Sequence, residues 1–269
     1  MVPLSILIRN KDSRYISTTL NSLKGSIDER IEIIVVDSSA NPLKNDGVES
    51  IKIISFNGNR TEALIEGSLY INGKNVLILD SDQIIDNQLL NELCLCQNDM
   101  CIINEVSYNN NIIGKLSDMN RKYLFNFALK HANPMIPAIP RFYKTEVFKK
   151  AIANLPEENI KKIIQHEDSM IYYEAYKITN DLTFNHGPIY NVDPSFKDFL
   201  LKSYKYGVFN GAIKKNPLIS SDFKKLFKTI DSRRIWYDKE LGFNPGLILD
   251  CIKGVPYLTG ELRSKLNIP

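Results

Sequence analysis

Two acidic groups in this sequence have the residue types and spacing to do chemistry. Asp80 and Asp82 follow an apolar run in LILDSDQIID, and Glu167 and Asp168 stand in HEDSM, close to the start of an expected helix. An Asp-x-Asp pair can hold a hard divalent cation together with phosphate oxygens. A further carboxylate across the site can act as a general base. The two groups therefore supply the parts of a metal-assisted displacement.

Both groups also have structural interpretations. An Asp-x-Asp pair is common in turns, and acidic residues at a helix N-terminus interact favourably with the helix dipole. HEDSM lacks the second His of the H-E-x-x-H zinc pattern, so a metalloprotease is not indicated. The patterns G-x-G-x-x-G and G-x-x-x-x-G-K-[ST] are absent too. Bound phosphates would therefore need another group, such as a cation, to neutralise them.

The order of apolar runs indicates the elements that position these carboxylates. Strands are predicted over residues 4–8, 31–36, 51–56 and 76–79, with helices over 15–23 and from a cap at Thr61. Such alternation predicts a doubly wound α/β sheet with mainly parallel strands. Further along, helices are predicted over residues 86–94, 121–130, 142–153 and 159–176. A strand is predicted over 100–106 and a turn or hairpin over 107–115. Past His186 the chain is predicted to be mainly helical.

Polar residues follow the four predicted strands at their carboxyl ends. In open α/β sheets ligands bind at these ends. We therefore expect one rim to gather Arg9, Asn10, Asp37, Asn59, Arg60, Asp80, Ser81 and Asp82. For Arg60 a structural ion pair with Glu62 or Asp37 is an equal alternative.

Composition and length describe an ordinary globular protein. The chain has 269 residues, 43% hydrophobic and 24% charged, and we expect a larger unit over residues 1–190 and a helical one over 191–269. The four cysteines lack paired C-x-x-C knuckles, which favours reduced, buried thiols in a cytoplasmic protein. Neither a secretory signal nor an apolar window of about 18 residues is present.

Charge is distributed unevenly along the chain. The net charge is +3, yet residues 197–269 hold 14 Lys and Arg against 7 Asp and Glu. Within this region, residues 214–234 mix basic and apolar side chains, as an interfacial helix, a nucleic-acid patch or a solvated basic face would. We expect no nucleic-acid partner, and a peripheral contact with the cytoplasmic membrane face is the further expectation. Trp236 and Tyr237 are candidates for sugar stacking or for an interface.

An ordered set of segments resembles a known family. The segments SILIRNKDSRYISTTLNSL, IEIIVVDSS, GNRTEALIEGSLYINGKNVLILDSD, PRFYKTEVF and HEDSMIYYEAYK are similar to those of the inverting glycosyltransferases of family 2, which have the GT-A fold. The resemblance covers roughly residues 3–210. It implies a mixed, mainly parallel sheet with a small helical C-terminal region.

The resemblance also implies roles for individual residues. Asp37 would contact the nucleotide base, Asp80 and Asp82 would hold Mn²⁺ or Mg²⁺ with the diphosphate, and Asp168 would be the base, with Glu167 beside it. The donor would be a UDP- or GDP-sugar and the acceptor a hydroxyl of a glycan or lipid. Among the other rim residues, Arg9, Asn10, Asn59, Arg60 and Ser81 would bind the donor. Arg141 would border the acceptor pocket.

One position departs from the family pattern. Many members have a His where this chain has Asn191, and His186, five residues earlier, is the candidate substitute metal ligand. Because of this departure, an alternative function remains: the chain could be a binding module that has lost catalysis and docks on an anionic membrane or a protein. A nucleotidyltransferase is a further alternative, but the glycine- and lysine-rich N-terminal loop of such enzymes is absent.

Overall fold

The computed structural model describes residues 2–24, 30–43, 51–131, 138–156, 160, 166–215 and 237–266. Its main feature is an eight-stranded sheet with the order β3-β2-β1-β4-β7-β6-β8-β5. The first half contains β1 (Leu4–Asn10), β2 (Ile31–Asp37), β3 (Ile51–Ser55) and β4 (Asn75–Asp80), which are all parallel. β1 is buried at every residue, as expected for a central parallel strand covered on both faces.

The second half of the sheet is mixed. It contains β7 (Phe142–Lys144), β6 (Met100–Ser107), β8 (Leu182–Asn191) and β5 (Gln83–Ile85). β7 runs antiparallel to β4 and β6, β8 is parallel to β6, and β5 is antiparallel to β8. The predicted α/β class with a mainly parallel sheet is confirmed, and the architecture is consistent with a GT-A type fold.

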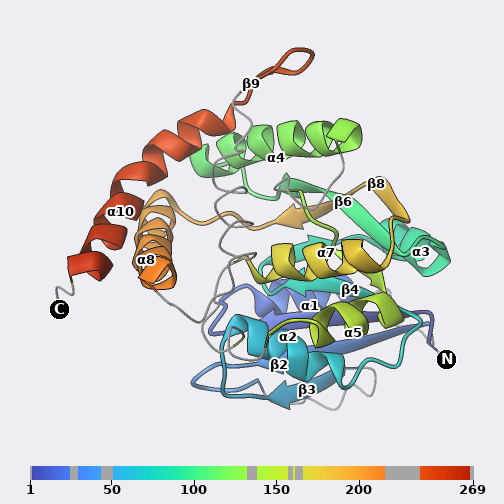
Figure 1. Cartoon of the computed structure of the whole chain (residues 1–269). Helices are drawn as coiled ribbons and strands as arrows, with labels where there is room; N and C mark the ends of the chain where they lie inside the picture. The colour runs from blue at the N-terminus through green and yellow to red at the C-terminus, as the bar shows by residue number, and fades with distance from the viewer. Residues whose placement is uncertain are drawn as a thin grey trace.

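Helices cover both faces of the sheet (Figure 1). On one face, α1 (Ile16–Lys24) and α3 (Asn87–Leu95) pack on the even-numbered side chains of β1. On the other face, α2 (Arg60–Ser68), α5 (Thr145–Ala153) and α7 (Glu167–Ile178) pack around Leu7. The split follows from the alternation of side chains along a strand.

Two further helices pack together beside the sheet. α8 (Phe196–Lys215) and α10 (Gly246–Leu266) lie side by side, and α4 (Ile112–His131) covers β6 (Figure 1). A methyl group added at Gly207 or Gly260 would overlap a backbone carbonyl of the facing helix, so glycine allows the two backbones to approach closely. A hairpin of β9 (Tyr237–Asp238) and β10 (Gly242–Phe243) precedes α10. No helix in the described ranges is long and apolar enough to cross a membrane.

Several predicted boundaries were wrong. The helix predicted over 121–130 begins at Ile112, so it replaces part of the expected turn over 107–115. The helix predicted over 142–153 begins with strand β7, because residues 142–144 pair with β4 and β6. Asn59, not Thr61, caps α2. The chain past His186 continues as strand β8 to Asn191 before it becomes helical.

Other predictions fall partly outside the described residues. Of the helix predicted over 159–176, the structure describes residue 160 and α7, and residues 161–165 are outside it. Most of the basic segment 214–234, and Trp236 with it, also lies outside the described ranges.

Candidate active site

A cavity of about 430 Å³ opens at the carboxyl ends of β1 and β4. Its inner wall comes from the strand ends and from the first turn of α2, and its outer wall comes from the end of β8, from α4, α8 and α10. This is the edge of the sheet where a parallel α/β fold binds ligands. Of the predicted rim residues, those that line the cavity are Arg9, Asn10, Asn59, Arg60, Asp80, Ser81 and Asp82.

Arg9 joins the two acidic groups that the sequence singles out. Its guanidinium is buried and lies 2.6 Å from a carboxylate oxygen of Glu167, 3.2 Å from Asp168 and 2.6 Å from Asp80. The bonds to Glu167 and Asp168 span 158 and 159 residues of sequence. The N–H groups of Arg9 are directed at these carboxylates, so Arg9 holds the two acidic groups together. Its contact with a nucleotide-sugar donor stays a prediction.

Two further arginines complete an arginine–carboxylate cluster, defined here by the residues Arg9, Arg60, Arg141, Asp80, Glu167 and Asp168. Arg60 lies 2.7 Å from Asp80 and 2.5 Å from Glu167. It therefore pairs with these residues and not with Glu62 or Asp37, the alternative that the sequence left open.

Arg141 reaches the same cluster from the start of β7. It is buried, and it bonds Glu105 at 2.8 Å and approaches Asp168 at 3.5 Å and Asp80 at 3.4 Å. It also lines a second cavity of about 170 Å³, whose other walls are largely apolar. Whether an acceptor contacts Arg141 remains the prediction made from the family resemblance.

The cluster controls the protonation of two of its carboxylates. Burial raises the pKa of Asp80, but Arg60, Arg9 and Arg141 outweigh it and hold the pKa well below the usual value. Burial also raises the pKa of Asp168, and Arg9, Arg141 and Arg60 again lower it overall. Asp80 and Asp168 are therefore carboxylates at neutral pH.

Asp82 differs from Asp80 although only one residue separates them. Burial and the neighbouring charge of Asp80 raise the pKa of Asp82. No described side chain donates a hydrogen bond to its carboxylate, which lines the cavity. The same cavity is lined by Lys202 of α8, whose pKa is raised by Tyr206 and also by Asp82.

The side chains available as metal ligands meet the needs of a hard cation only in part. No group of three His, Cys, Asp or Glu side chains that could hold a metal occurs in the described parts of the chain. Asp80 already contacts three arginines, whereas Asp82 has available oxygens. Mg²⁺ and Mn²⁺ accept one or two carboxylates when phosphate oxygens and water complete the shell. The residues present therefore fit such an ion when a diphosphate is bound with it.

His186 lies away from the cavity, and its role as a metal ligand stays a prediction. Between the pairs Ile103 with Asn185 and Asn104 with Pro188, β8 contains two extra residues, and His186 is one of them. The bulge places its ring against Phe125 at 5.2 Å between centroids, and it does not line the cavity.

Asn191 does line the cavity, where the family pattern has a His. Its amide accepts a hydrogen bond from Gln83 at 2.9 Å and donates one to Glu105 at 3.1 Å. Gln83 in turn accepts from the backbone N–H of Asp80, and Glu105 bonds Arg141. Asn191 thus connects the turn at Asp80 with the arginine–carboxylate cluster.

Asp37 lies beneath the cavity instead of in its wall. It is 1% exposed, and it accepts hydrogen bonds from Asn10 at 2.9 Å, from Ser39 N at 3.1 Å and from Leu43 N at 2.6 Å. Burial raises its pKa, and bonds from Ser39, Leu43 and Asn10 lower it overall. Asn10 and Ser38 line the cavity above it. Its contact with a base stays a prediction, and in this structure Asp37 shapes the loop after β2.

The remaining rim residues are fixed by local bonds. Asn59 forms a capping box with Glu62, which presents Arg60 on the first turn of α2. The Ser81 carbonyl accepts hydrogen bonds from Ser13 and Thr19, so the turn between Asp80 and Asp82 is anchored on α1 and the loop before it. These two bonds fix the conformation of the turn.

The start of α7 has an unusual backbone. His166 adopts φ +68°, a left-handed conformation that is uncommon for a residue other than glycine. Glu167 follows it directly and is buried, and the Asp168 side chain is 13% exposed. Neither carboxylate lines the large cavity; both lie behind Arg9 and Arg60.

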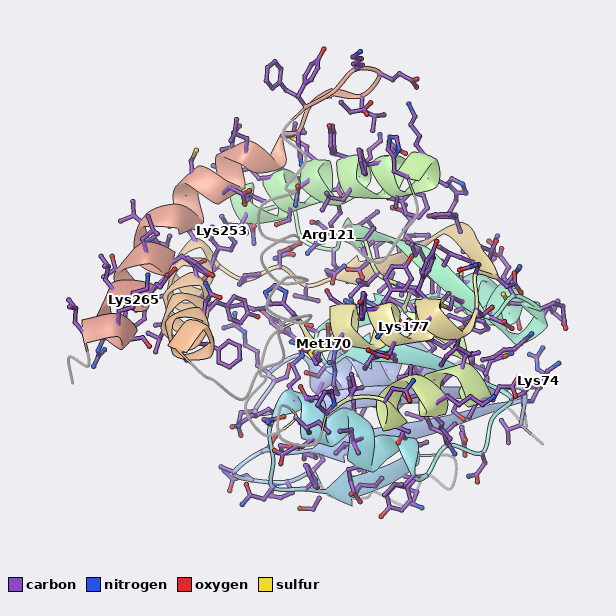
Figure 2. The ribbon with its side chains drawn as sticks, in the orientation of Figure 1. Lys74, Arg121, Met170, Lys177, Lys253 and Lys265 are labelled. Carbon is purple, nitrogen blue, oxygen red and sulfur yellow. The ribbon has the colours of Figure 1, made fainter. Side chains whose placement is uncertain are left out.

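Sequence reasoning missed several residues of the outer wall. Phe199, Lys202, Ser203 and Tyr206 line the cavity from one face of α8. Their spacing is that of a single helix face, which was the available signal. Arg121 of α4 pairs with Asp193 at 2.8 Å, and Arg121 and Lys253 of α10, both labelled in Figure 2, also line the cavity.

Comparisons with known proteins bear on the fold. No family model matches the chain, and no curated protein matches it in sequence. Among solved structures, TarS of S. aureus, a glycosyltransferase, matches with a TM-score of 0.52 and 14% identity over 98% of this chain. The chain spans 55% of that TarS chain.

Structures of TarS residues 1–349 match somewhat better. Their complexes with UDP-GlcNAc and with UDP each have a TM-score of 0.54 and 16% identity, and they cover 98% of this chain and 81% of theirs. The likeness establishes that this chain shares the fold of TarS.

Proposed function

We propose that this chain is an inverting glycosyltransferase that moves a sugar from a nucleoside diphosphate donor to a hydroxyl acceptor. One observation carries the proposal: the buried guanidinium of Arg9 joins Asp80, which lines the cavity at the end of β4, to Asp168 of α7, which lies just behind the cavity wall. The UDP-sugar complexes of TarS, which shares the fold, support a nucleotide-sugar donor.

The donor diphosphate belongs beside Asp82 and Lys202. These side chains line the cavity from opposite walls; no described side chain donates a hydrogen bond to Asp82, and none accepts one from Lys202. Lys202 offers an ammonium to the leaving phosphate, and Arg60, partly exposed, stands at the inner wall. A Mg²⁺ or Mn²⁺ ion bound through Asp82 would supply further positive charge to the departing diphosphate.

Asp168 has the protonation state that a base for the acceptor hydroxyl needs. Its lowered pKa keeps it ionised at neutral pH, and Arg9 and Arg141 fix its two oxygens. The arginine contacts also make Asp168 a weak base. Asp168 would therefore accept the proton of the acceptor hydroxyl only after charge has developed on the acceptor oxygen during the single displacement. Glu167 orients Arg9 and Arg60 and does not itself meet the substrate in this scheme.

The first test is a titration of the purified chain with UDP, GDP and their sugar conjugates by calorimetry, with and without Mn²⁺. We expect binding of one base that strengthens with the metal. Absence of binding for all of them would contradict the donor site.

Asp168→Asn tests the chemical step separately. Removing a general base typically costs about 10²- to 10⁴-fold in rate. We expect transfer to fall by about that factor, with donor affinity within about threefold of the native value. Glu146→Gln, on the exposed first turn of α5, is the control for the loss of one carboxylate. Unchanged turnover in Asp168→Asn would exclude this mechanism.

A further inference from the structure

Two buried polar atoms at the large cavity have no hydrogen-bond partner among the described residues. They are the amide oxygen Oδ1 of Asn10 and the hydroxyl oxygen Oγ of Ser38, and both residues line the cavity. Asn10 is only 4% exposed. A buried polar atom without a hydrogen bond is costly, so native proteins leave few such atoms unpaired. A ligand that pairs with both atoms would remove this cost.

The neighbours of Asn10 set the orientation of its amide. The Nδ2 group donates to an oxygen of Asp37 at 2.9 Å and to the Ser39 hydroxyl at 3.1 Å. Although burial raises the pKa of Asp37, hydrogen bonds from Ser39, Leu43 and Asn10 lower it overall, so Asp37 is a carboxylate that only accepts. An amide turned the other way would place its oxygen against this carboxylate. Oδ1 of Asn10 is therefore the atom left for a ligand.

Asn10 and Ser38 come from neighbouring strand ends. β1 ends at Asn10, β2 ends at Asp37, and the backbone N–H of Ser38 donates to the Asn10 carbonyl at 2.9 Å. Asp82 follows β4, which lies on the other side of β1. Two strand spacings separate the ends of β2 and β4 by about 10 Å. In a nucleotide the ribose separates base and phosphates, so a diphosphate beside Asp82 would leave the base near Asn10 and Ser38.

The two unpaired atoms match one edge of uracil. This edge has a ring N–H between two carbonyl oxygens. Oδ1 of Asn10 accepts the N–H, and the Ser38 hydroxyl donates to an adjacent carbonyl. Ser38 is partly exposed, and rotation about χ1 can turn its hydroxyl toward the cavity. In cytosine the corresponding ring nitrogen has no hydrogen, so it would leave Oδ1 without this bond.

We propose that Asn10 and Ser38 recognise the uracil of a UDP-linked donor, and that Asp37 is a positioning residue that holds the Asn10 amide. The inference rests on the proposed transferase function and adds the identity of the base and the residues that select it. It also replaces a direct contact between Asp37 and the base with an indirect role, because the oxygens of Asp37 accept bonds from Asn10, Ser39 and Leu43.

Calorimetric titration of the full chain with UDP, CDP and 3-methyl-UDP tests the choice of base. In 3-methyl-UDP a methyl group replaces the hydrogen of the ring N–H. We expect UDP to bind about tenfold more tightly than either of the other two, because each of them leaves the Asn10 oxygen unpaired. Tighter binding of GDP than of UDP would overturn the assignment of uracil.

Ser38→Ala tests the hydroxyl separately from the fold. We expect it to weaken UDP binding about 5- to 10-fold. Its melting temperature should not fall, because the hydroxyl makes no hydrogen bond with a described residue of the free protein. Ser55→Ala is the matched control, since Ser55 is exposed at the end of β3 and outside the cavity lining. Loss of thermal stability together with UDP affinity in Ser38→Ala would assign Ser38 to the fold and overturn its role.

Asn10→Leu removes the amide oxygen and keeps a side chain of similar size. We expect this variant to bind UDP and 3-methyl-UDP equally, and thermal unfolding checks that it is folded. Equal binding of the two nucleotides by the native chain would overturn the inference, as would unchanged UDP affinity in Ser38→Ala. In both cases UDP binding itself would uphold the donor site. Absence of binding for every nucleotide would overturn the donor site and the inference together.

Discussion

The inner and outer walls of the cavity use charge in opposite ways. On the inner wall, Arg9 is buried and each of its contacts is with a carboxylate of the same cluster. On the outer wall, Lys202 is exposed and makes no hydrogen bond with a described residue. The guanidinium of Arg9 is thus paired within the fold, while the ammonium of Lys202 is available to a ligand.

This difference separates positioning from binding. A buried ion-pair cluster costs desolvation and holds its members in one geometry. An exposed lysine on a helix contributes little to stability until a ligand meets it. Mutations in the inner wall should therefore change mainly the free energy of unfolding. Mutations in the outer wall should change mainly the affinity for a ligand.

Arg9→Met should have the largest effect on stability. It removes the most buried of the arginines that pair with Asp80, Glu167 and Asp168, and breaking a buried pair typically costs about 3–5 kcal/mol. Urea unfolding measures the change. Arg14→Met is the control, because Arg14 is 64% exposed in its pair with Asp198 and should change the free energy of unfolding by less than about 1 kcal/mol. Similar losses in the two variants would remove the distinction between buried and exposed charges.

Lys202→Met should lower the affinity for the nucleoside diphosphate and leave the free energy of unfolding nearly unchanged. A hydrogen bond to a charged group is worth about 1.5–3 kcal/mol, so nucleoside diphosphate affinity should fall roughly 10- to 100-fold. Calorimetry gives the affinity, and urea unfolding should differ by less than about 0.5 kcal/mol. Lys205→Met, exposed on the same helix and outside the cavity lining, is the control. Unaltered affinity in Lys202→Met would show that the outer wall does not bind the donor.

Gly207→Ala tests whether the close approach of α8 and α10 holds the outer wall in place. The added methyl group would overlap the Tyr257 carbonyl, and overpacking of this kind costs about 1–3 kcal/mol. Gly254→Ala is the matched change on α10, since nothing lies within 4 Å of its added methyl group. It should stabilise by about 0.5–1 kcal/mol through helix propensity. Thermal unfolding compares the two, and equal destabilisation would argue against the close packing.

The smallest effect concerns the thiols. Burial raises the pKa of Cys101 to about 12, so it stays a protonated thiol up to that pH, whereas Cys251 is exposed. A thiol reagent at pH 8 should label Cys251 first and leave Cys101 unlabelled until the chain is unfolded. Rapid labelling of Cys101 in the native chain would contradict the buried second half of the sheet.

The parallel half of the sheet could be predicted from the sequence, and much of the mixed half could not. Runs such as residues 31–36 are apolar throughout and are followed by turn residues, which identifies buried strands. Residues 142–144 form a strand only because β4 and β6 lie on either side of them, and such tertiary pairing leaves little trace in a three-residue pattern.

The site shows the same division. Position at the strand ends predicted that Arg9, Arg60 and Asp80 lie at one rim, as the structure has them, but it could not indicate that the two arginines pair with the carboxylates of the cluster. That outcome depends on where residues 141 and 167–168 return to the rim. The position of His186 outside the cavity lining could not be predicted, because it lies in a two-residue bulge of β8 and no spacing rule predicts the bulge.

The long sequence separation within the Arg9 cluster has a kinetic consequence. Arg9 and Glu167 are 158 residues apart, so their bond closes one of the longest loops in the chain. Contacts of this kind carry a high closure entropy and tend to form late in folding. Interactions that form only after the transition state of folding slow unfolding and have little effect on the folding rate. We expect the cluster to lower the rate of unfolding and to leave the rate of folding nearly unchanged.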